Sequence, residues 1–437
     1  MNPEFVFLIV AGIIFIGYLG LIFFKKTKIP DLLILLSVGL LLGPILGFVD
    51  SESLILFQGI LPYFASLALM MLLFDGGLNL KFFDTLKGLG NSLIFTITNL
   101  FFVLTSIFIL FFVFNFFGVY TIDPLVGLFI ACVLGGTSSA IILTLVVNTS
   151  ANEKTKTLLS LESALTDAFC VILAVAIGQI YISGSADIII VISNILTNFC
   201  IAGVVGFFIG IIFLKLITPL LKGRNYIYLM TLAIMFVTYS LISIFRGNGA
   251  IGVLVFGIVL GNSKEITTML KMHIIIISEE IKDFQGQLSF LIKTLFFVYL
   301  GLLFQVKFLN DINIIIISLI IVILIVGGRK ITAKLMGKLV PEIKTDENYL
   351  TYLCARGLAA AVLISLPASM GLLTIENTPF TQVFIENLTA IVFLVIVGTN
   401  IVTTIGVILA EKGKNTITPV EKKITKIDIP DAKTENK

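Results

Sequence analysis

The sequence predicts an all-α, polytopic membrane protein, and three observations support this fold class. Of the 437 residues, 58% are hydrophobic and 13% are charged, and the mean hydropathy is +1.12. No soluble domain of this length has such a composition. The apolar residues also form about 13 segments that read as transmembrane helices, and the charges between these segments separate into two sets. Each segment is justified below in chain order.

The apolar segments are separated by short polar or charged connections. They cover roughly residues 5–24, 30–49, 54–76, 89–117, 125–147, 158–182, 187–220, 226–245, 249–262, 286–306, 312–336, 348–372 and 381–410. The first has no basic flank and no small-residue cleavage site, so we interpret it as a retained span and not as a signal peptide. We therefore predict a transmembrane domain over residues 1–410 and a short, disordered cytoplasmic tail over residues 411–437.

Loop charge tests the number of spans independently. If alternate loops share one side of the membrane, that side collects the basic stretch 329–344 together with Lys25, Lys26, Lys28, Lys81, Lys87, Lys154, Lys156, Lys222 and Arg224. The other side carries mainly acids, with only Arg246 and Lys307 as bases. The positive-inside rule then predicts a cell-membrane protein with an external N-terminus and a cytoplasmic C-terminus. A miscount by one span would remove this separation, so we predict thirteen.

Several functional classes lack their sequence signals. The chain contains no P-loop and no dinucleotide fingerprint, so we expect no nucleotide, no nucleic-acid partner, no cofactor and no enzymatic activity. The cysteines Cys132, Cys170, Cys200 and Cys354 all lie in apolar segments, so we expect reduced packing residues and neither disulfides nor metal ligands. His273, the only histidine, lies in a polar connection and is interpreted as a solvated loop residue, with a pH sensor as the alternative.

Two carboxylates, Glu162 and Asp167, lie inside the sixth apolar segment. A charged group near the bilayer centre costs roughly 2.5–3.5 kcal/mol, so such residues are rare and usually line an ion path. Ser163 is four residues before Asp167 and shares its helix face, whereas Glu162 lies about 140° around the helix. We therefore predict two roles: ion and proton binding for Asp167, and a structural ion pair for Glu162.

A buried cation for this ion pair occurs in the twelfth segment. Arg356 must be paired there, because an unpaired charge in a low dielectric is too costly. Glu162 is the predicted partner, since both residues lie within spans and otherwise lack one. Lys293, in the tenth segment, is instead expected to extend its amine toward the cytoplasm.

Two further stretches interrupt apolar segments. Residues 135–140 (Gly-Gly-Thr-Ser-Ser-Ala) place glycines and hydroxyls at membrane depth, which is tolerated only where protein or water surrounds the backbone. Thr137 and Ser138 are therefore candidate oxygen ligands for a cation, with simple small-residue helix packing as the alternative. Asp75, followed by two glycines, is either part of a helix C-cap or an accessory acid at a cavity mouth.

The chain resembles a monovalent cation/proton antiporter of the CPA1 branch, the NhaP and NHE type. Motifs in the family order carry the resemblance: residues 28–30 with 39–44, 73–78 (Leu-Phe-Asp-Gly-Gly-Leu), 161–168 (Leu-Glu-Ser-Ala-Leu-Thr-Asp-Ala) and 355–358 (Ala-Arg-Gly-Leu). Two positions depart from the family pattern. Residues 137–139 are Thr-Ser-Ser where the family usually has Thr-Asp-Pro, and Thr166 replaces the usual asparagine before the essential aspartate.

The resemblance implies two inverted repeats, two broken helices that cross near the bilayer midplane, and a core that moves against a dimerisation domain. It implies a homodimer, contact with membrane lipid, and exchange of Na⁺, K⁺ or Li⁺ for H⁺. Asp167 would bind either ion, with Ser163, Thr137, Thr166 and Ser138 around it. Because neither Thr166 nor Ser138 ionises, we expect electroneutral exchange, with Asp75 as the residue able to add a second proton. The alternatives are a potassium efflux channel, another ion-coupled solute carrier, or a non-transporting membrane subunit.

Overall fold

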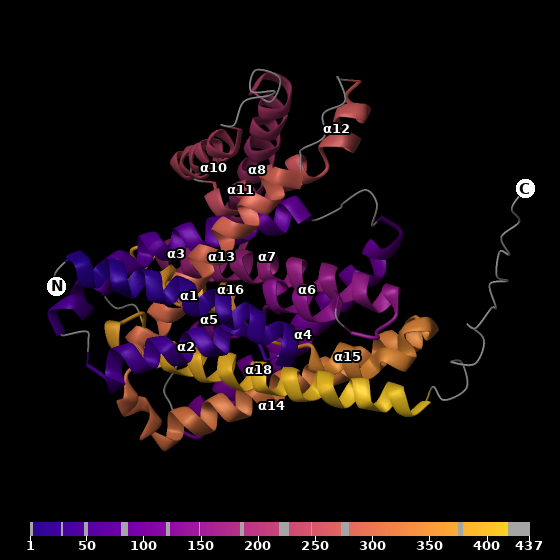
Figure 1. Ribbon diagram of the computed structural model, residues 1–437. Coiled ribbons are helices and arrows are strands. Elements are labelled where there is room, and N and C mark those ends of the chain that lie inside the picture. The colour runs from indigo at the N-terminus through magenta and orange to yellow at the C-terminus, as the bar shows by residue number, and fades with distance from the viewer. Residues whose placement is uncertain are drawn as a thin grey trace, which may run out of the picture.

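The structure is a computed structural model that describes residues 3–27, 29–47, 51–79, 86–118, 123–147, 149–183, 188–217, 227–245, 247–271, 279–374 and 379–417. Within these ranges the regular elements are helices, so the predicted all-α class is confirmed (Figure 1). His273, Arg246 and the tail from residue 418 lie outside the described residues.

The helices follow the apolar segments along the chain. They are α1 (Pro3–Thr27), α2 (Asp31–Leu40) with a π-helical turn (Leu41–Ile45), α3 (Ser51–Asn79), α4 (Leu86–Phe116), α5 (Pro124–Gly135), α6 (Ser139–Val147), α7 (Glu153–Ser183), α8 (Ile188–Ile212) with a π-helical turn (Phe213–Ile217), α10 (Ile227–Ile244), α11 (Gly249–Gly261), α12 (Ser263–Met269), α13 (Glu279–Leu303), α14 (Ile312–Leu339), α15 (Glu347–Tyr352), α16 (Leu358–Leu363), α17 (Leu366–Ser369) and α18 (Gln382–Ile417).

Each predicted segment corresponds to one helix or to a broken helix. Among the described residues, seven helices are long and apolar enough to cross a membrane, and the pair α11 and α12, bent by 79°, makes up to eight. Four shorter apolar helices add to these, in α1, α2, α3 and α5. The chain is thus a multi-span membrane protein, while the number of thirteen crossings stays a prediction.

The tail begins later than the sequence predicted. Residues 411–417, expected to be disordered, continue α18. Glu411 is held there because its carboxylate accepts hydrogen bonds from the Ser150 backbone N–H at 2.7 Å and from the Tyr349 hydroxyl at 2.8 Å. These contacts fix the end of α18 against the connection between α6 and α7 and against α15.

The helices pack in two groups. One group contains α4, α5, α6, α7, α14, α15 and α18, and the other contains α1, α2, α3, α8, α10, α11 and α13. The groups meet where α16 and α17 pack on α3 and where α7 packs on α8. Figure 1 shows α14 and α18 at one edge of the molecule and α8, α10 and α12 at the opposite edge. The sequence order is therefore interleaved between the groups.

Glycines allow two helices of the second group to touch along their backbones. A Cβ atom on Gly77 would lie 2.5 Å from the Leu254 carbonyl oxygen, and one on Gly257 would lie 2.6 Å from the Phe74 carbonyl oxygen. Only glycine permits this approach of α3 and α11. Gly77 therefore serves the packing of α3 on α11, and the C-cap interpretation of this stretch is wrong, because α3 continues to Asn79.

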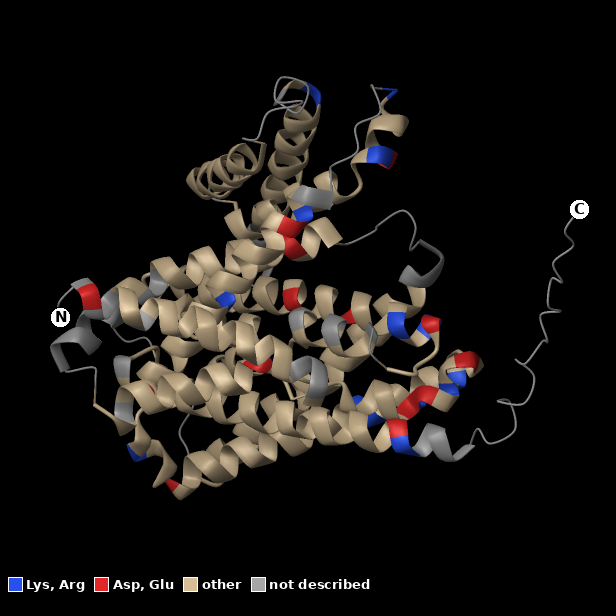
Figure 2. Cartoon of the chain, viewed as in Figure 1, with Lys and Arg blue, Asp and Glu red and all other residues tan. Residues whose placement is uncertain are grey.

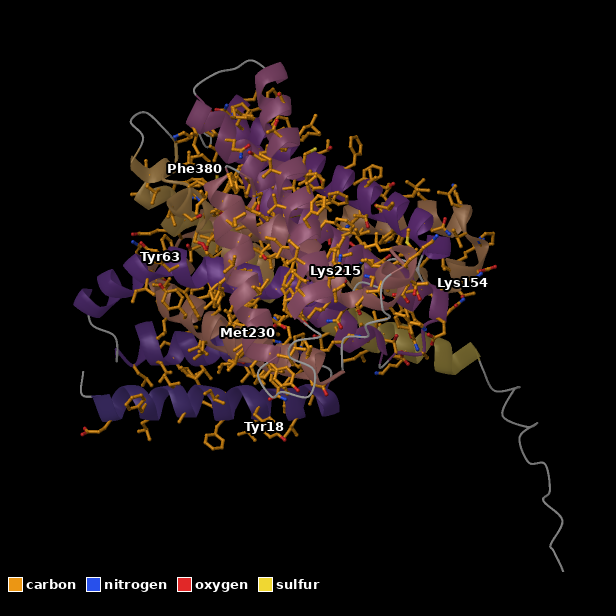
Figure 3. The ribbon with its side chains drawn as sticks, turned by 90° about the horizontal axis from the view of Figure 1, so that it is seen from above. Tyr18, Tyr63, Lys154, Lys215, Met230 and Phe380 are labelled. Atoms are coloured by element: carbon orange, nitrogen blue, oxygen red, sulfur yellow. The ribbon has the colours of Figure 1, made fainter. Side chains whose placement is uncertain are left out.

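Large apolar side chains cover the outside of the molecule, while charges gather at its ends. Figure 3 shows Tyr18 on α1 and Tyr63 on α3 at the periphery, and these side chains are 60% and 79% exposed. Such outward apolar exposure is typical of a surface that faces lipid. Figure 2 shows charged residues gathered near the described end of α18, with few in the middle of the helices. Charges in the middle therefore need individual explanations.

Candidate functional site

Two broken helices cross at the centre of the first helix group. α5 ends at Gly135 and α6 begins at Ser139, whereas α15 ends at Tyr352 and α16 begins at Leu358. The two breaks touch directly, because the Ser138 backbone N–H donates to the Ala355 carbonyl oxygen at 2.9 Å. The predicted crossing of two broken helices is thus confirmed.

The backbone of the second break is held by polar side chains of α18. The Cys354 N–H donates to the Thr403 hydroxyl at 3.3 Å, and the Arg356 N–H donates to the Thr399 hydroxyl at 3.1 Å. The Asn400 amide donates to the Arg356 carbonyl oxygen at 2.9 Å. Buried backbone groups outside a helix need such partners, since no water is available at membrane depth.

The first break is held by Thr166 on α7. The Thr137 backbone N–H donates to the Thr166 hydroxyl oxygen at 3.1 Å, and the Thr166 hydroxyl donates to the Ser163 carbonyl oxygen at 3.1 Å. Thr166 therefore satisfies a backbone group that the interruption of the helix exposes. The sequence predicted that Thr166 binds an ion, whereas in the structure its hydroxyl holds the broken helix in place.

Glu162 is the most fully bonded carboxylate of the crossing. Its Oε1 accepts hydrogen bonds from Arg329 Nη1 at 3.0 Å, from the Thr137 hydroxyl at 3.0 Å and from the Asn99 amide at 3.3 Å. Its Oε2 accepts from Arg329 Nη2 at 3.0 Å. The guanidinium is thus bidentate on a carboxylate, and both side chains are 0% exposed. This bidentate geometry stabilises the buried ion pair of Glu162 and Arg329.

The predicted ion pair between Glu162 and Arg356 is wrong, because Arg329 occupies that position. We assigned Arg329 to the cytoplasmic basic stretch 329–344, but it lies within α14 on the buried face that also contains Ile321 and Ile325. This four-residue spacing is a signal that the sequence does contain. Arg329 also donates Nε to the Leu350 carbonyl oxygen at 2.8 Å, which satisfies an orphan carbonyl near the end of α15.

Arg356 joins the same cluster through one hydroxyl. Its Nη1 donates to Thr137 Oγ1 at 3.0 Å, and that oxygen also accepts from Arg329 at 3.1 Å while donating to Glu162. One donor and two acceptor positions are all that a hydroxyl has, so Thr137 is saturated. Nε and Nη2 of Arg356 have no hydrogen-bond partner among the described residues, although the side chain is fully buried.

Among the described residues, only one of the two carboxyl oxygens of Asp167 has hydrogen-bond partners. Its Oδ2 accepts from the Ser139 hydroxyl at 2.9 Å and from the Ser139 backbone N–H at 3.3 Å. Its Oδ1 is buried and has no hydrogen-bond partner among the described residues. A Cβ atom on Gly136 would lie 3.2 Å from this Oδ1, so the glycine leaves the space beside the free oxygen open. Among the described residues, Asp167 thus has one buried carboxyl oxygen without a hydrogen-bond partner at the break between α5 and α6.

Sequence reasoning missed Ser139 and expected Ser163 in its place. The Ser163 hydroxyl donates to the Ser160 carbonyl oxygen at 3.0 Å and so turns back to its own helix. Ser139 is the third hydroxyl residue of the run 137–139 and the first residue of α6. Its position before an apolar run was the available signal, because hydroxyl residues at helix starts bind anionic or acceptor groups.

Asp75 lies apart from the crossing, in a cavity of about 230 Å³ between α3 and α13. It accepts a hydrogen bond from Asn79 at 3.1 Å, and the cavity extends to Leu358, the first residue of α16. Lys293 lines the same cavity and forms an ion pair with Asp31 at 2.8 Å. The expectation that Lys293 extends freely to the cytoplasm is therefore wrong.

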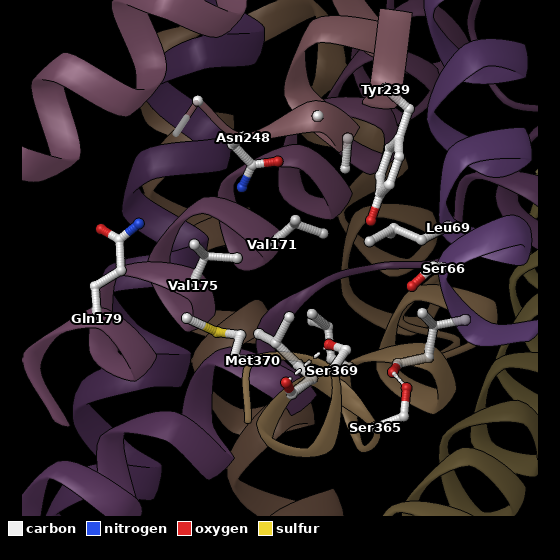
Figure 4. A pocket seen from close by; sticks show the side chains of 16 residues that line it. Ser66, Leu69, Val171, Val175, Gln179, Tyr239, Asn248, Ser365, Ser369 and Met370 are labelled. Atoms are coloured by element: carbon white, nitrogen blue, oxygen red, sulfur yellow. Dashed lines mark hydrogen bonds between the residues drawn. The ribbon is translucent and has the colours of Figure 1, made fainter. Parts of the chain in front are cut away.

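A second cavity of about 230 Å³ lies between α3, α7, α10, α11 and the α16–α17 region (Figure 4). Val171, one turn after Asp167 on α7, lines it. Figure 4 shows Tyr239 and Asn248 on one side of this cavity and Ser365 and Ser369 on the other. The two cavities share no lining residue, but neighbouring residues of α3 contribute to both: Leu69 lines this cavity and Ala68 lines the one that contains Asp75.

The cysteines are free thiols in this structure. Cys132, Cys170 and Cys354 are buried in the helix packing, as expected, whereas Cys200 on α8 is exposed. Among the described residues no group of three or more histidine, cysteine, aspartate or glutamate side chains gathers around a common point. The polar side chains described at the crossing are hydroxyls, the amides of Asn99 and Asn400, two carboxylates and two guanidinium groups.

Comparison with known proteins agrees with this geometry. Residues 5–411 match the family model described as the transmembrane sodium/hydrogen exchanger. The structure of the sodium proton antiporter MjNhaP1 from Methanocaldococcus jannaschii at pH 8 is similar, with a TM-score of 0.72 and 19% identity over 94% of this chain and 100% of that chain. An electron-microscopy structure of the same antiporter gives a TM-score of 0.69 and 20% identity over 95% and 97% of the two chains.

The similarity to these structures establishes the fold, and the family model covers nearly the whole chain. The fold includes the predicted inverted repeats, in which a long helix, a broken helix and a second long helix recur as α4, α5–α6 and α7 and as α14, α15–α16 and α18. The half-bonded carboxylate lies where the two broken helices cross. The chain belongs to the sodium/hydrogen exchanger family, a family of transporters.

Proposed function

We propose that the protein is a secondary active antiporter that exchanges a monovalent cation for H⁺ through Asp167. Na⁺ is the first candidate, with K⁺ and Li⁺ as the others. One observation carries this proposal: a buried carboxylate at the crossing of two broken helices keeps one oxygen without a hydrogen-bond partner. Buried polar atoms are normally bonded, so an orphan of this kind marks a place for an exchangeable ligand.

Cation and proton compete for this oxygen. The ionised carboxylate suits a partly dehydrated cation, which prefers oxygen ligands, and the neutral acid suits the empty, low-dielectric site. Ser163 still has hydroxyl lone pairs free, and Ser138 presents a hydroxyl at the crossing, so both can complete the shell after side-chain rotation. Thr137 and Thr166 already use their hydroxyl hydrogens, and we propose that they mainly hold the shape of the break.

We propose that exchange is electroneutral, one cation for one proton. Glu162 is bound by Arg329 in a bidentate pair and accepts four hydrogen bonds, and we propose that it stabilises the core and takes no part in the exchange. Ser138 cannot ionise, and Asp75 lies in a separate cavity. Asp167 then alternates between one H⁺ and one cation, and both loaded forms of the core carry the same charge.

We propose that transport proceeds by alternating access, and the two cavities support this proposal. The cavity that contains Asp75 and the cavity in Figure 4 both end near the contact between α3 and α16. Movement of one helix group against the other would widen one cavity while it closes the other. By the loop-charge rule the Asp75 cavity faces the cytoplasm, the N-terminus is external and the C-terminus is cytoplasmic.

The setting of this activity is also a proposal. We place the protein in the cell membrane, in contact with lipid, as a homodimer that contributes to pH homeostasis. The second helix group would supply the dimer contact, since the first group contains the ion site and has to move. No cofactor is proposed, because ion gradients alone drive such exchange.

A channel for potassium efflux, or another ion-coupled solute carrier on this scaffold, is the second candidate. The structure favours the antiporter, because Asp167 is only 3% exposed and lines neither of the two cavities. A channel needs a continuous path, and its flux would not be coupled to protons. Saturable, proton-coupled counterflow therefore distinguishes the two.

The direct test is exchange in proteoliposomes loaded with a pH-sensitive dye and challenged in turn with Na⁺, K⁺ and Li⁺. We expect dye recovery with at least one cation, saturation with rising cation concentration, and no recovery for Asp167→Asn. Recovery that does not saturate, or that proceeds without proton movement, would favour a channel. Wild-type recovery in Asp167→Asn would contradict the assignment of Asp167.

A further inference from the structure

We propose that Ser139 is a positioning residue that sets how well protons compete with the cation at Asp167. The inference rests on the proposed function, because it concerns the same carboxylate. In this proposal the two oxygens of Asp167 have different roles. Ser139 fixes Oδ2 by hydrogen bonds, and Oδ1 binds either the proton or the cation.

Two donors of one residue converge on one oxygen. Ser139 is the first residue of α6, so its backbone N–H has no partner within that helix. This N–H lies 3.3 Å from Asp167 Oδ2, and the Ser139 hydroxyl lies 2.9 Å from the same atom. The start of the nine-residue α6 also carries a partial positive charge, which favours the anion further. Oδ2 is thus fixed while Oδ1 stays free.

These contacts favour the ionised carboxylate over the protonated acid. Hydrogen bonds donated to a charged acceptor are stronger than those donated to a neutral one, so their loss makes protonation easier. A cation binds only when the proton has left. Weakening the hydrogen bonds from Ser139 therefore lets the proton compete more effectively with the cation for Asp167, while the charges of the other residues at the site stay the same.

Other charged and titratable groups near Asp167 remain unchanged by a substitution at Ser139. They are Glu162 and Cys170 on α7, Cys132 on α5, Arg329 on α14 and Arg356 between α15 and α16. Arg356 has the opposite charge and two unpartnered donor nitrogens. Its field favours the ionised carboxylate in the wild type and in every Ser139 variant alike, so it cancels from the comparison.

The geometry also supplies a graded set of variants. Ser139→Thr keeps the hydroxyl and the N–H, Ser139→Ala removes the hydroxyl, and Ser139→Pro removes both donors. Proline is well accommodated at the first position of a helix, because the N–H that it lacks has no helical partner there. Ser318→Ala on α14 is the matched control, since this buried serine bonds only the Ile314 carbonyl oxygen of its own helix at 2.7 Å.

The experiment measures the apparent cation KM and the maximal exchange rate of each variant in proteoliposomes between pH 6 and 9. For Ser139→Ala we expect the pH of half-maximal activity to rise by about 0.5–1 unit, with a rise in KM of about three- to tenfold on the acidic side. Ser139→Pro should shift it by about 1–2 units, and Ser139→Thr and Ser318→Ala should behave as wild type. Maximal rates at alkaline pH and saturating cation should stay close to wild type.

The outcomes separate this inference from the proposed function. If Asp167→Asn is inactive but Ser139→Ala and Ser139→Pro keep the wild-type pH profile, the role of Ser139 is overturned and the antiporter proposal stands. If Ser139→Ala lowers the maximal rate without moving the profile, Ser139 is merely structural, which also overturns the inference. If Asp167→Asn exchanges normally, the proposed function itself fails. Should Ser139→Pro not fold, as judged by size-exclusion chromatography, Ser139→Ala alone decides.

Discussion

Two carboxylates on one helix, Glu162 and Asp167, are surrounded in opposite ways. Glu162 accepts four hydrogen bonds, two of them from one guanidinium group, and neither of its oxygens is free. Asp167 accepts two, both on Oδ2 and both from Ser139, and its Oδ1 has no hydrogen-bond partner in the part of the chain that the structure describes. Both side chains are buried, so exposure does not distinguish them. From this difference in bonding we infer that Glu162 stabilises the fold and that Asp167 is the proposed ion-binding residue.

The bonding partners also differ in what they connect. Glu162 on α7 joins Arg329 on α14, Thr137 between α5 and α6, and Asn99 on α4. Among the described residues, Asp167 accepts hydrogen bonds only from the first residue of α6. Binding and release at Asp167 can therefore proceed without loosening the contacts that keep the first helix group together. The proposed movement of the core requires that ion binding at Asp167 leaves the stabilising contacts of Glu162 intact.

The largest effect is expected for Asp167→Asn. The amide keeps the shape of the side chain but carries neither a negative charge nor an exchangeable proton, so cation/proton exchange should fall to the level of empty liposomes. Size-exclusion chromatography and thermal unfolding should stay close to wild type, because Asp167 has few partners to lose. Dye recovery in proteoliposomes measures the loss, and full recovery would reverse the roles that we assign to the two acids.

The next effect is on stability and concerns Glu162 and Arg329. Replacing either one, as in Glu162→Gln or Arg329→Gln, should destabilise the protein by roughly 3–5 kcal/mol, because a buried charge loses its counter-charge. The double variant should lose much less than the sum. Thermal unfolding in detergent gives the coupling energy, and the same cycle with Glu162 and Arg356 is the control, for which we expect weak coupling. Equal coupling in both cycles would contradict the pairing.

A smaller effect is expected from Thr137→Val, which keeps the shape and removes the hydroxyl. The substitution leaves Glu162, Arg329 and Arg356 each without one hydrogen-bond partner, and we expect a loss of about 2 kcal/mol. Thr403→Val is a matched control: its hydroxyl accepts a long hydrogen bond of 3.3 Å from the Cys354 N–H and has a weak contact of 3.8 Å with the Cys354 thiol, so its loss should cost less. A Thr137→Val variant as stable as wild type would show that water replaces the hydroxyl.

The smallest effect is expected from Asp75→Asn. Asp75 lies in the cavity between α3 and α13 and has Asn79 as a neutral partner, so it adds negative potential on the way to the site. Its neutralisation should raise the apparent cation KM about two- to fivefold, more strongly at low salt, where charges are less screened. Transport currents on a solid-supported membrane should be absent before and after the change. A current in the wild type that disappears in Asp75→Asn would identify Asp75 as a second proton site.

The sequence was sufficient for the helices and for the position of the acids. Apolar segment lengths located the helices, and the glycines and hydroxyls of residues 135–140 located the first break. The sequence did not show which charged residues form ion pairs with one another. The sequence predicted Arg356 as the counter-charge of Glu162, whereas the packing of α14 against α4 and α15 brings Arg329 to it.

The sequence was also insufficient to predict the partners of Lys293, Ser163 and Ser139. Lys293 pairs with Asp31, which is 262 residues away in sequence, and no local pattern indicates that contact. Ser163 and Asp167 share a helix face, yet the hydroxyl bonds its own backbone, because an i−3 carbonyl is always within its reach. Ser139 meets Asp167 only after α5 has broken and α6 has changed direction.

The most direct test of the central claim is the release of protons on cation binding. Purified protein in weakly buffered detergent solution, with a pH-sensitive dye, is titrated with NaCl near the pH of half-maximal exchange, and choline chloride is the control. We predict that the wild type releases protons in proportion to cation binding, that Glu162→Gln does so wherever it remains folded, and that Asp167→Asn releases none. Proton release by Asp167→Asn equal to that of the wild type would show that cation and proton do not compete at this carboxylate.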